Sequence, residues 1–293
     1  MENNRPLIAG IGELLWDVFP SRKKAGGAPI NFVYHATQMG AEGCAVSAVG
    51  DDASGAEIVR ELEKNRIRSC IEKVAHPTGR VLVELNEGLP SYTIIEGVAW
   101  DYLPLTQQAI DRVGKADAVC FGTLAQRSPV SRNTIKTLLE YAPGDALLFF
   151  DINLRGHYYS KELVEESLQK ANVFKLNDEE LVTLRAMFGL EGSDDEVCRM
   201  MMKKYNLRYL VLTAGSVAST VYSPSETSVI PTPKVTVADT VGAGDSFSGA
   251  FVYSILTGKS LREAHQKAVD IAAFVCTRQG AWPPYDPSLI PSL

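Results

Sequence analysis

The chain has 293 residues, of which 45% are apolar and 22% are charged, and its formal net charge is −6. This composition is typical of a globular protein with one large domain, and the acidic balance argues against a nucleic-acid-binding surface, since the basic residues cluster only at Arg22-Lys23-Lys24. We expect no membrane span and no secretory signal, because apolar runs stay below ~18 residues, and we expect a cytoplasmic location, because the five cysteines show no paired spacing.

Short apolar runs alternate with helical patterns along the chain. Strands are predicted at 7–12, 45–49, 118–121, 146–151, 173–176 and 209–212, and helices at 30–39, 56–64, 132–141, 161–169 and 195–204. This alternation predicts an α/β fold with a mostly parallel central sheet and helices on both faces. Ligands bind at the carboxyl ends of the strands in such sheets. Asp51, Asp151 and Asn177 follow predicted strands, which favours a site at that edge.

One segment interrupts this alternation. No helical period occurs from Cys70 to Trp100, and strands are predicted at Arg80–Leu85 and Tyr92–Ile95. Together with Trp16–Phe19 they predict a small sheet that acts as a lid, formed by about residues 14–24 and 70–103. A lid would exclude water from a reaction that takes place beneath it. A plain β-hairpin insertion is the alternative.

Two early clusters suit hydroxyl groups. Glu13 and Asp17 follow the first predicted strand, and Asp17 could accept hydrogen bonds from two adjacent hydroxyls of a polyol. Gly26–Asn31 is a small-residue turn that opens a helix, so Asn31 offers a donor and an acceptor in the first helical turn. Surface solvation of Asp17 and a structural role for Asn31 are the alternatives.

Polar residues also follow the fourth predicted strand, in the sequence Asp151-Ile152-Asn153-Leu154-Arg155. Alternate residues at a strand end point the same way, so an acid, an amide and a guanidinium are expected on one side of a cleft. Arg155 would suit a phosphate or a transition-state charge. The alternative is a local salt bridge.

Two further turns suit a nucleotide. Asn177 opens a helix, either as its N-cap or, with Glu180, by acting through water on magnesium. The segment Thr213-Ala214-Gly215-Ser216 follows a strand. It offers a hydroxyl and backbone N–H groups free of bulky side chains, which suit nucleotide phosphates. A simple strand-ending turn is the alternative.

The most informative stretch is Asp239–Phe247, Asp-Thr-Val-Gly-Ala-Gly-Asp-Ser-Phe. Gly242-Ala243-Gly244 precede Asp245 and an apolar helical run, which predicts a helix that opens on a tight turn. Backbone N–H groups and the positive end of the helix dipole then converge on one spot suited to phosphate. Asp245 fits that spot if it accepts a proton from a hydroxyl that attacks the phosphate. An ordinary helix start is the alternative.

In combination, these motifs make the chain resemble the ribokinase (PfkB) family of carbohydrate kinases from end to end, which implies a single ribokinase-like domain over residues 1–293. Residues 239–252 fit the family's C-terminal signature, and Asn177 with Glu180 fits its N-x-x-E motif. The N-terminal signature departs at Val33, where relatives usually have a small residue. The segments 12–17, 26–29 and 151–155 look most like those of bacterial fructokinases.

The resemblance implies roles for individual residues. Asp245 would be the general base, and the backbone of Gly242, Ala243, Gly244 and Asp245 would form the anion hole. The sugar would be held by Asp17, Gly27, Asn31 and Arg155, and the nucleotide by Asn177, Thr213, Gly215, Ser216 and Gly244, with Glu180 binding magnesium through water. Many relatives bind potassium, at positions that match Asp239, Val241, Val275, Arg278 and Gly280, but Pro284 replaces a serine hydroxyl that some relatives supply.

The resemblance therefore implies an ATP-dependent sugar kinase that uses magnesium, acts on a primary hydroxyl of a ketose such as fructose, and requires neither nucleic acid nor membrane. A nucleoside or another sugar is the alternative substrate. A non-catalytic protein that binds a sugar or a nucleotide on the same fold is the alternative of another class. Relatives often pair through their lids, which implies a homodimer.

Overall fold

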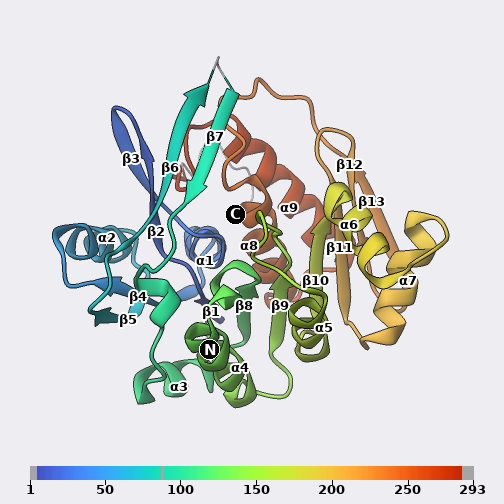
Figure 1. The fold of residues 1–293 in the computed structure, drawn as a ribbon. Helices are drawn as coiled ribbons and strands as arrows, with labels where there is room; N and C mark the ends of the chain where they lie inside the picture. The colour runs from blue at the N-terminus through green and yellow to red at the C-terminus, as the bar shows by residue number, and fades with distance from the viewer. Residues whose placement is uncertain (1–4, 87–88, 286–293) are drawn as a thin grey trace.

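A nine-stranded sheet forms the body of the protein, and a separate four-stranded sheet stands beside it (Figure 1). The structure is a computed structural model that describes residues 5–86 and 89–285. The strand order in the large sheet is β13-β12-β11-β10-β9-β8-β1-β4-β5. The strands are β1 (Leu7–Ile11), β4 (Glu42–Gly50), β5 (Arg68–Val74), β8 (Ala118–Gly122), β9 (Leu147–Asp151), β10 (Val173–Asn177), β11 (Tyr209–Ala214), β12 (Ala218–Tyr222) and β13 (Thr227–Pro231). All neighbours pair in parallel except at β12 and β13, which confirms the predicted sheet.

Helices cover both faces of this sheet, as predicted. One face carries α1 (Ala28–Gln38), α2 (Ala53–Lys64), α8 (Ala243–Leu256) and α9 (Leu261–Cys276), and the other carries α3 (Gln107–Val113), α4 (Pro129–Tyr141), α5 (Lys161–Lys170), α6 (Asp178–Phe188) and α7 (Asp194–Lys204). Successive strand residues enter opposite cores, since Ile8 packs with α1 and α8 while Ala9 packs with α4 and α5. No helix in the described part of the chain combines the length and apolar character that crossing a bilayer requires.

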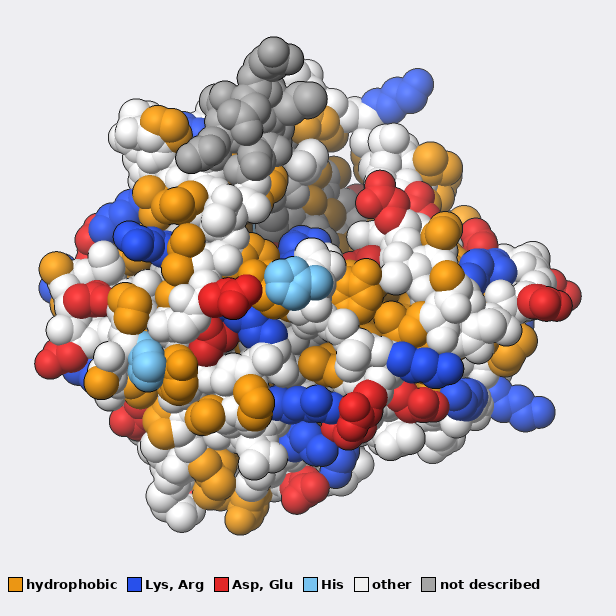
Figure 2. Space-filling model, in the orientation of Figure 1, with side chains coloured by type: hydrophobic (Ala, Val, Ile, Leu, Met, Phe, Trp, Pro, Cys, Tyr) orange, Lys and Arg blue, Asp and Glu red, His pale blue; other side chains and the backbone are white. Residues whose placement is uncertain are grey.

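The small sheet has the strand order β3-β2-β6-β7. Its strands are β2 (Leu15–Phe19), β3 (Arg22–Gly26), β6 (Gly79–Asn86) and β7 (Leu89–Ile94). The predicted segment 70–103 extends beyond it at both ends. Residues up to Val74 form β5 of the large sheet, because Cys70 is buried against the main core, and Ala99–Tyr102 form a 3-10 helix with Trp100 buried in that core. Figure 2 shows this face of the molecule hollowed beside the small sheet.

Helices α1 and α8 approach each other closely at Gly249. A Cβ atom on Gly249 would lie 2.5 Å from the backbone oxygen of Phe32, so only glycine fits this contact. Gly249 lies one turn after Asp245, and Phe32 directly follows Asn31. The close crossing therefore brings the first turns of the two helices together, where the predicted site residues lie.

Candidate active site

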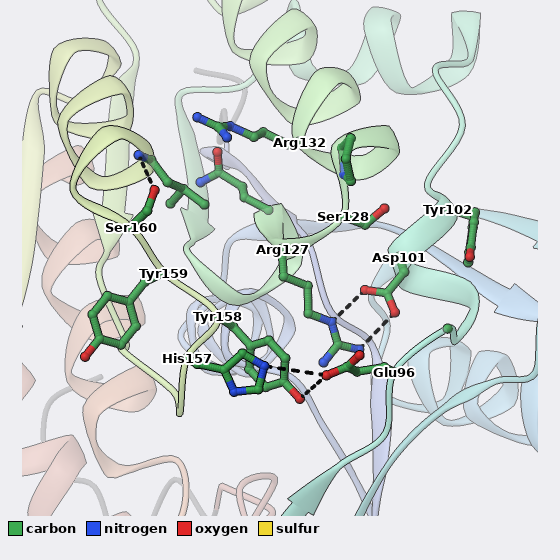
Figure 3. Close-up of a pocket in the computed structure, with 14 residues that line it drawn as sticks. Glu96, Asp101, Tyr102, Arg127, Ser128, Arg132, His157, Tyr158, Tyr159 and Ser160 are labelled. Carbon is green, nitrogen blue, oxygen red and sulfur yellow. Dashed lines mark hydrogen bonds and ion pairs between the residues drawn. The ribbon is translucent and has the colours of Figure 1, made fainter.

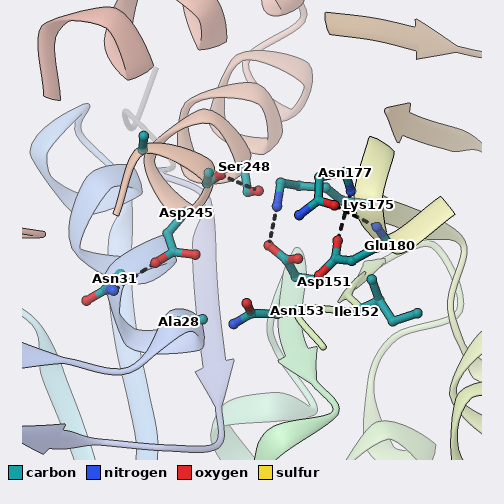
Figure 4. A network of polar contacts seen from close by, with 12 residues as sticks. Ala28, Asn31, Asp151, Ile152, Asn153, Lys175, Asn177, Glu180, Asp245 and Ser248 are labelled. Carbon is teal, nitrogen blue, oxygen red and sulfur yellow. Dashed lines mark hydrogen bonds and ion pairs between the residues drawn. The ribbon is translucent and has the colours of Figure 1, made fainter. Parts of the chain in front are cut away.

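The first turn of α8 carries Asp245 (Figure 4), and its backbone N–H groups are candidate donors to a ligand. Its N-cap, Gly242, has φ 80°, and a Cβ there would lie 2.8 Å from Ala281 Cα, so the turn requires glycine. No side chain caps this helix within the described residues. Ala243 N–H already bonds Thr240 O at 3.2 Å. The N–H groups of Gly244 and Asp245 are therefore the better-placed donors of the predicted anion hole.

Asp245 lies in this same turn, half-buried. Its Oδ2 accepts a 2.7 Å hydrogen bond from Asn31 Nδ2, which leaves Oδ1 as the oxygen available to a substrate hydroxyl. Burial and then the charge of Asp151 raise the pKa of Asp245 to about 6, while the Asn31 hydrogen bond, Lys175 and Arg155 oppose that rise. A carboxylate with this pKa is ionised at neutral pH and still basic enough to accept a proton.

Asn31 is held from two sides. Its Oδ1 accepts a 2.7 Å hydrogen bond from Trp282 Nε1, and the Trp282 indole stacks on Tyr34 with ring centroids 5.2 Å apart. Because the indole is only a donor, the Asn31 amide oxygen must face Trp282 and its NH₂ must face Asp245. Asn31 thus keeps one N–H and one lone pair of Oδ1 for a sugar, the donor and the acceptor that the sequence suggested. Trp282 itself was not predicted as a site residue.

The predicted sugar side adjoins Asn31. Gly27 has φ 115°, and a Cβ there would lie 2.0 Å from Glu13 O, so glycine is required. Glu13 is buried, its Oε1 accepts Ala28 N–H at 3.2 Å, and its Oε2 has no partner among the described residues. Burial, above all, raises the pKa of Glu13 to about 7. Sequence reasoning noted Glu13 after the first strand without assigning it a role in the site.

Asp17 lies on β2 opposite Lys24 of β3. Burial first, and then Asp239 and Asp245, raise its pKa to about 6, whereas Lys24 lowers it. Asp17 is therefore electrostatically coupled to the first turn of α8 although it belongs to the small sheet.

The expected alternation over 151–155 is wrong, because β9 ends at Asp151 and Asn153 has φ 40°. Asp151 is buried in an ion pair with Lys175, with a distance of 2.7 Å between Lys175 Nζ and Asp151 Oδ2. Asn153 points toward Ala28 (Figure 4). Arg155 is exposed, and its Nη1 donates a 3.0 Å hydrogen bond to the backbone oxygen of Leu154. The three polar groups do not line one strand face, although Arg155 still lowers the pKa of Asp245.

Lys175 is a residue that sequence reasoning missed. It interrupts the apolar strand β10, is buried, and its Nζ would lie 3.2 Å from a Cβ placed on Gly244. Burial lowers its pKa, but Asp151, Glu180 and Asp245 outweigh burial and raise it, so the ammonium stays charged beside the anion hole. A lysine within an apolar strand was the available signal.

The Asn177 N-cap is confirmed. Asn177 Oδ1 accepts Glu180 N–H at 2.8 Å, and Glu180 Oε2 accepts Asn177 N–H at 2.8 Å. Glu180 Oε1 accepts Leu154 N–H at 2.9 Å, and burial raises the pKa of this carboxyl. Each Glu180 carboxylate oxygen thus accepts a hydrogen bond from a backbone N–H group. Each also keeps one lone pair, which can accept a hydrogen bond from a metal-bound water. Within the described residues, no cluster of three or more His, Cys, Asp and Glu side chains could hold a metal alone.

The remaining nucleotide-side residues lie next to Asn177. Thr213 of β11 is in register with Asn177 of β10, so both occupy the carboxyl edge of the sheet. Gly215 has φ 47° and Ser216 is exposed in the turn between β11 and β12. This places the predicted nucleotide-side residues together.

Several groups that the resemblance assigns to potassium already have hydrogen-bond partners in the structure. Both Asp239 oxygens accept backbone N–H groups, Oδ1 from Val241 at 3.1 Å and Oδ2 from Gly280 at 2.9 Å. The Val275 carbonyl accepts Arg278 N–H at 2.9 Å. Pro284 has no hydroxyl to offer. The Lys24 ammonium, 3.8 Å from Asp239 Oδ2, adds a positive charge at this place.

A pocket of about 490 Å³ lies elsewhere, around Arg127 (Figure 3). Arg127 makes a bidentate ion pair with Asp101, with Nε 2.8 Å from Oδ1 and Nη2 2.9 Å from Oδ2. Its guanidinium lies between the rings of Trp100 and Tyr158. The third guanidinium nitrogen, Nη1, lacks a hydrogen-bond partner among the described residues but is sealed from solvent. Since no reacting group of the predicted site lines this pocket, we assign Arg127 a structural role.

Comparisons with known proteins show the family to which the chain belongs. The model of the pfkB family carbohydrate kinases matches residues 12–287. Fructokinase of Escherichia coli is 31% identical over 245 residues, which cover 80% of this chain and 76% of that protein. The uncharacterized sugar kinase PH1459 of Pyrococcus horikoshii is 28% identical in its crystal structure, with a TM-score of 0.83 and 94% and 93% of the two chains covered.

A crystal structure of fructokinase from Vibrio cholerae O395 with fructose, ADP and a calcium ion has a TM-score of 0.81 at 20% identity, and 97% of each chain is covered. At that identity the likeness concerns the fold alone, which agrees with the predicted ribokinase-like architecture. The family match extends over nearly the whole chain. This protein therefore belongs to the pfkB family of carbohydrate kinases, as its motifs predicted.

Proposed function

We propose that this sugar kinase transfers the γ-phosphoryl group of ATP to a primary hydroxyl of a ketose, with fructose as the substrate. The observation that carries the proposal is Asp245 in the first turn of α8, with Oδ1 available and the N–H groups of Gly244 and Asp245 beside it. The hydroxyl proton moves to Asp245 Oδ1 while the hydroxyl oxygen attacks the γ-phosphorus. The bond from that phosphorus to the β–γ bridging oxygen breaks, and ADP leaves.

The backbone of this turn and Lys175 would stabilise negative charge that develops on the transferred group. Asp17, Gly27, Asn31 and Arg155 would bind the sugar hydroxyls. Asn177, Thr213, Gly215 and Ser216 would bind the nucleotide, and Glu180 would hold magnesium through water, which neutralises the phosphates when it is bound. The small sheet would act as the lid that excludes water, and it is our candidate surface for a homodimer in the cytoplasm.

Fructose is supported by the names of relatives. E. coli fructokinase is a relative at 31% identity, and the V. cholerae structure contains fructose and ADP. A 5-dehydro-2-deoxygluconokinase of Bacillus cereus at 27% identity makes another sugar, or a nucleoside, the alternative substrate. A non-catalytic binding protein is the weaker alternative, because a pure binder has no need of the carboxylate at Asp245.

The test is a coupled assay of ADP release with ATP, magnesium and a panel of free sugars, sugar phosphates and nucleosides. We expect the highest kcat/KM with fructose, and a phosphate on its primary hydroxyl in the product. Asp17→Ala should raise the sugar KM more than it lowers kcat. Release of ADP with a nucleoside alone would change the substrate, and a lack of release with every acceptor would refute the kinase activity.

A further inference from the structure

The carboxylate of Asp239 joins the two loops that flank the anion hole. Through Val241 N–H it holds the turn before α8, and through Gly280 N–H it holds the loop after α9. Its charge lies close to where the phosphates of a nucleotide would be bound. A positive counter-charge at Asp239 would therefore keep the turn before α8 attractive to anions.

Lys24 of β3 carries such a charge. Its Nζ lies 3.8 Å from Asp239 Oδ2, is sealed from solvent, and has no hydrogen-bond partner among the described side chains and backbone. The lysine stem crosses Gly280, where a Cβ would lie 2.5 Å from Lys24 Cδ and 2.8 Å from Nζ. Glycine at 280 therefore makes room for the ammonium beside Asp239.

The strand that carries Lys24 is fixed to the same loop by a second contact. Arg22 Nη1 donates to Gln279 Oε1 at 2.8 Å. Burial first, and then Arg22, lower the pKa of Lys24 below its usual value, although Asp239 and Asp17 act in the opposite direction. The contacts of Arg22 and Lys24 with Gln279 and Gly280 hold β3 and this loop together.

We propose that the Lys24 ammonium supplies to Asp239 the positive charge that a bound potassium ion would otherwise supply, so that the anion hole needs no monovalent cation. The inference rests on the proposed role of the α8 amino terminus. Two observations support it: Pro284 offers no hydroxyl, and a second cation would be repelled by Lys24.

The experiment compares wild type with Lys24→Met in potassium, sodium and tetramethylammonium chloride at equal ionic strength. Wild-type kcat should agree within about twofold among the three salts. In tetramethylammonium, the kcat of Lys24→Met should be about tenfold below that of wild type. This loss is smaller than the one caused by removing an anion-hole donor itself, and potassium should restore much of it. Lys23→Met is the matched control, because Lys23 lies on the same strand but pairs with Glu57.

Thermal unfolding provides a readout that does not depend on the substrate. Potassium should raise the melting temperature of Lys24→Met and leave those of wild type and Lys23→Met unchanged. A wild type that needs potassium for activity, or is stabilised by it, would overturn the inference. A Lys24→Met enzyme with higher sugar KM and no response to potassium would make Lys24 a sugar contact instead. If no acceptor were phosphorylated, the kinase proposal would fail, while the melting data would still decide the role of Lys24.

Discussion

Asn31 Nδ2 donates a 2.7 Å hydrogen bond to Asp245 Oδ2, although the two residues are 214 positions apart. The contact depends on the close crossing of α1 and α8 at Gly249, one turn further along. It fixes the carboxylate and favours its ionised form. The geometry of the proposed base is therefore set by a helix from the other end of the chain.

Trp282 should act as a positioning residue for Asp245 through Asn31. Trp282→Phe keeps the stacking on Tyr34 and removes the N–H that orients the Asn31 amide. A net hydrogen bond contributes about 0.5–1.5 kcal/mol, so we expect kcat to fall by about 2- to 12-fold, with little change in the KM for ATP. Steady-state kinetics measure this effect. Unchanged kcat in Trp282→Phe, with a normal melting temperature, would remove Trp282 from the site.

Asp245→Asn should abolish most of the turnover. The amide keeps the size of the side chain but cannot accept the hydroxyl proton. General base catalysis contributes about 10²–10⁴-fold, so kcat should fall by that factor while the sugar KM changes little. Ser246→Ala is the control, since its hydroxyl bonds only the backbone oxygen of Ala243 in the same turn. Near-normal turnover of Asp245→Asn would refute the role of the base.

The rate should depend on pH through Asp245. Its pKa is raised to about 6, and the base acts only when ionised, so kcat should be constant at high pH and fall below about pH 6, by about tenfold per pH unit. Asp17 also has a pKa of about 6, so the sugar KM should rise in the same range. A kcat profile that stays flat to about pH 4.5 would contradict this assignment.

Glu13 should make the protein less stable as the pH rises. Burial raises the folded-state pKa to about 7 from 4.5, so the folded state binds this proton more tightly than the unfolded chain does, and stability is lost between these two values. Glu13→Gln mimics the protonated acid. We expect it to raise the free energy of unfolding at about pH 8, by at most about 3 kcal/mol, and to leave it unchanged near pH 4. Urea titrations at the two pH values test this, and an equal effect at both would contradict it.

Arg127 should matter for stability. The side chains of Arg127 and Asp101 are 7% and 6% exposed, so Arg127→Met leaves an uncompensated buried carboxylate. We expect a loss of about 3–5 kcal/mol in the free energy of unfolding, and recovery of much of it when Asp101→Leu is added. Arg132→Met, which breaks a more exposed pair with Glu166, should cost under about 1 kcal/mol. A similar loss in both single variants would show that burial of the pair is unimportant.

Local signals in the sequence predicted much of the fold. Gly242 opens α8 because only glycine tolerates its backbone, and the predicted apolar strands pair in parallel in one sheet, as expected. Helix α9 and the strands β12 and β13 were not predicted. The capping box of Ser260 and Glu263 was available as a signal for α9, since the two residues bond reciprocally at its start.

The contacts within the site were harder to predict. The Trp282–Asn31 bond joins residues 251 positions apart, and no periodicity or spacing reports such a pair. The alternation rule failed at Asn153 because a left-handed residue ends the extended backbone. Residue types and turn chemistry thus indicated the residues of the proposed site, whereas packing of distant helices decided how their hydrogen bonds are divided.

The early position of Asn31 and the late positions of Asp245 and Trp282 have a consequence for synthesis on the ribosome. A nascent chain that has emerged through β11 holds every parallel strand of the large sheet, yet it lacks the helix that bears the base and the indole that orients Asn31. The proposed base and the indole that orients its partner therefore join Asn31 only after α8 and Trp282 have been synthesised.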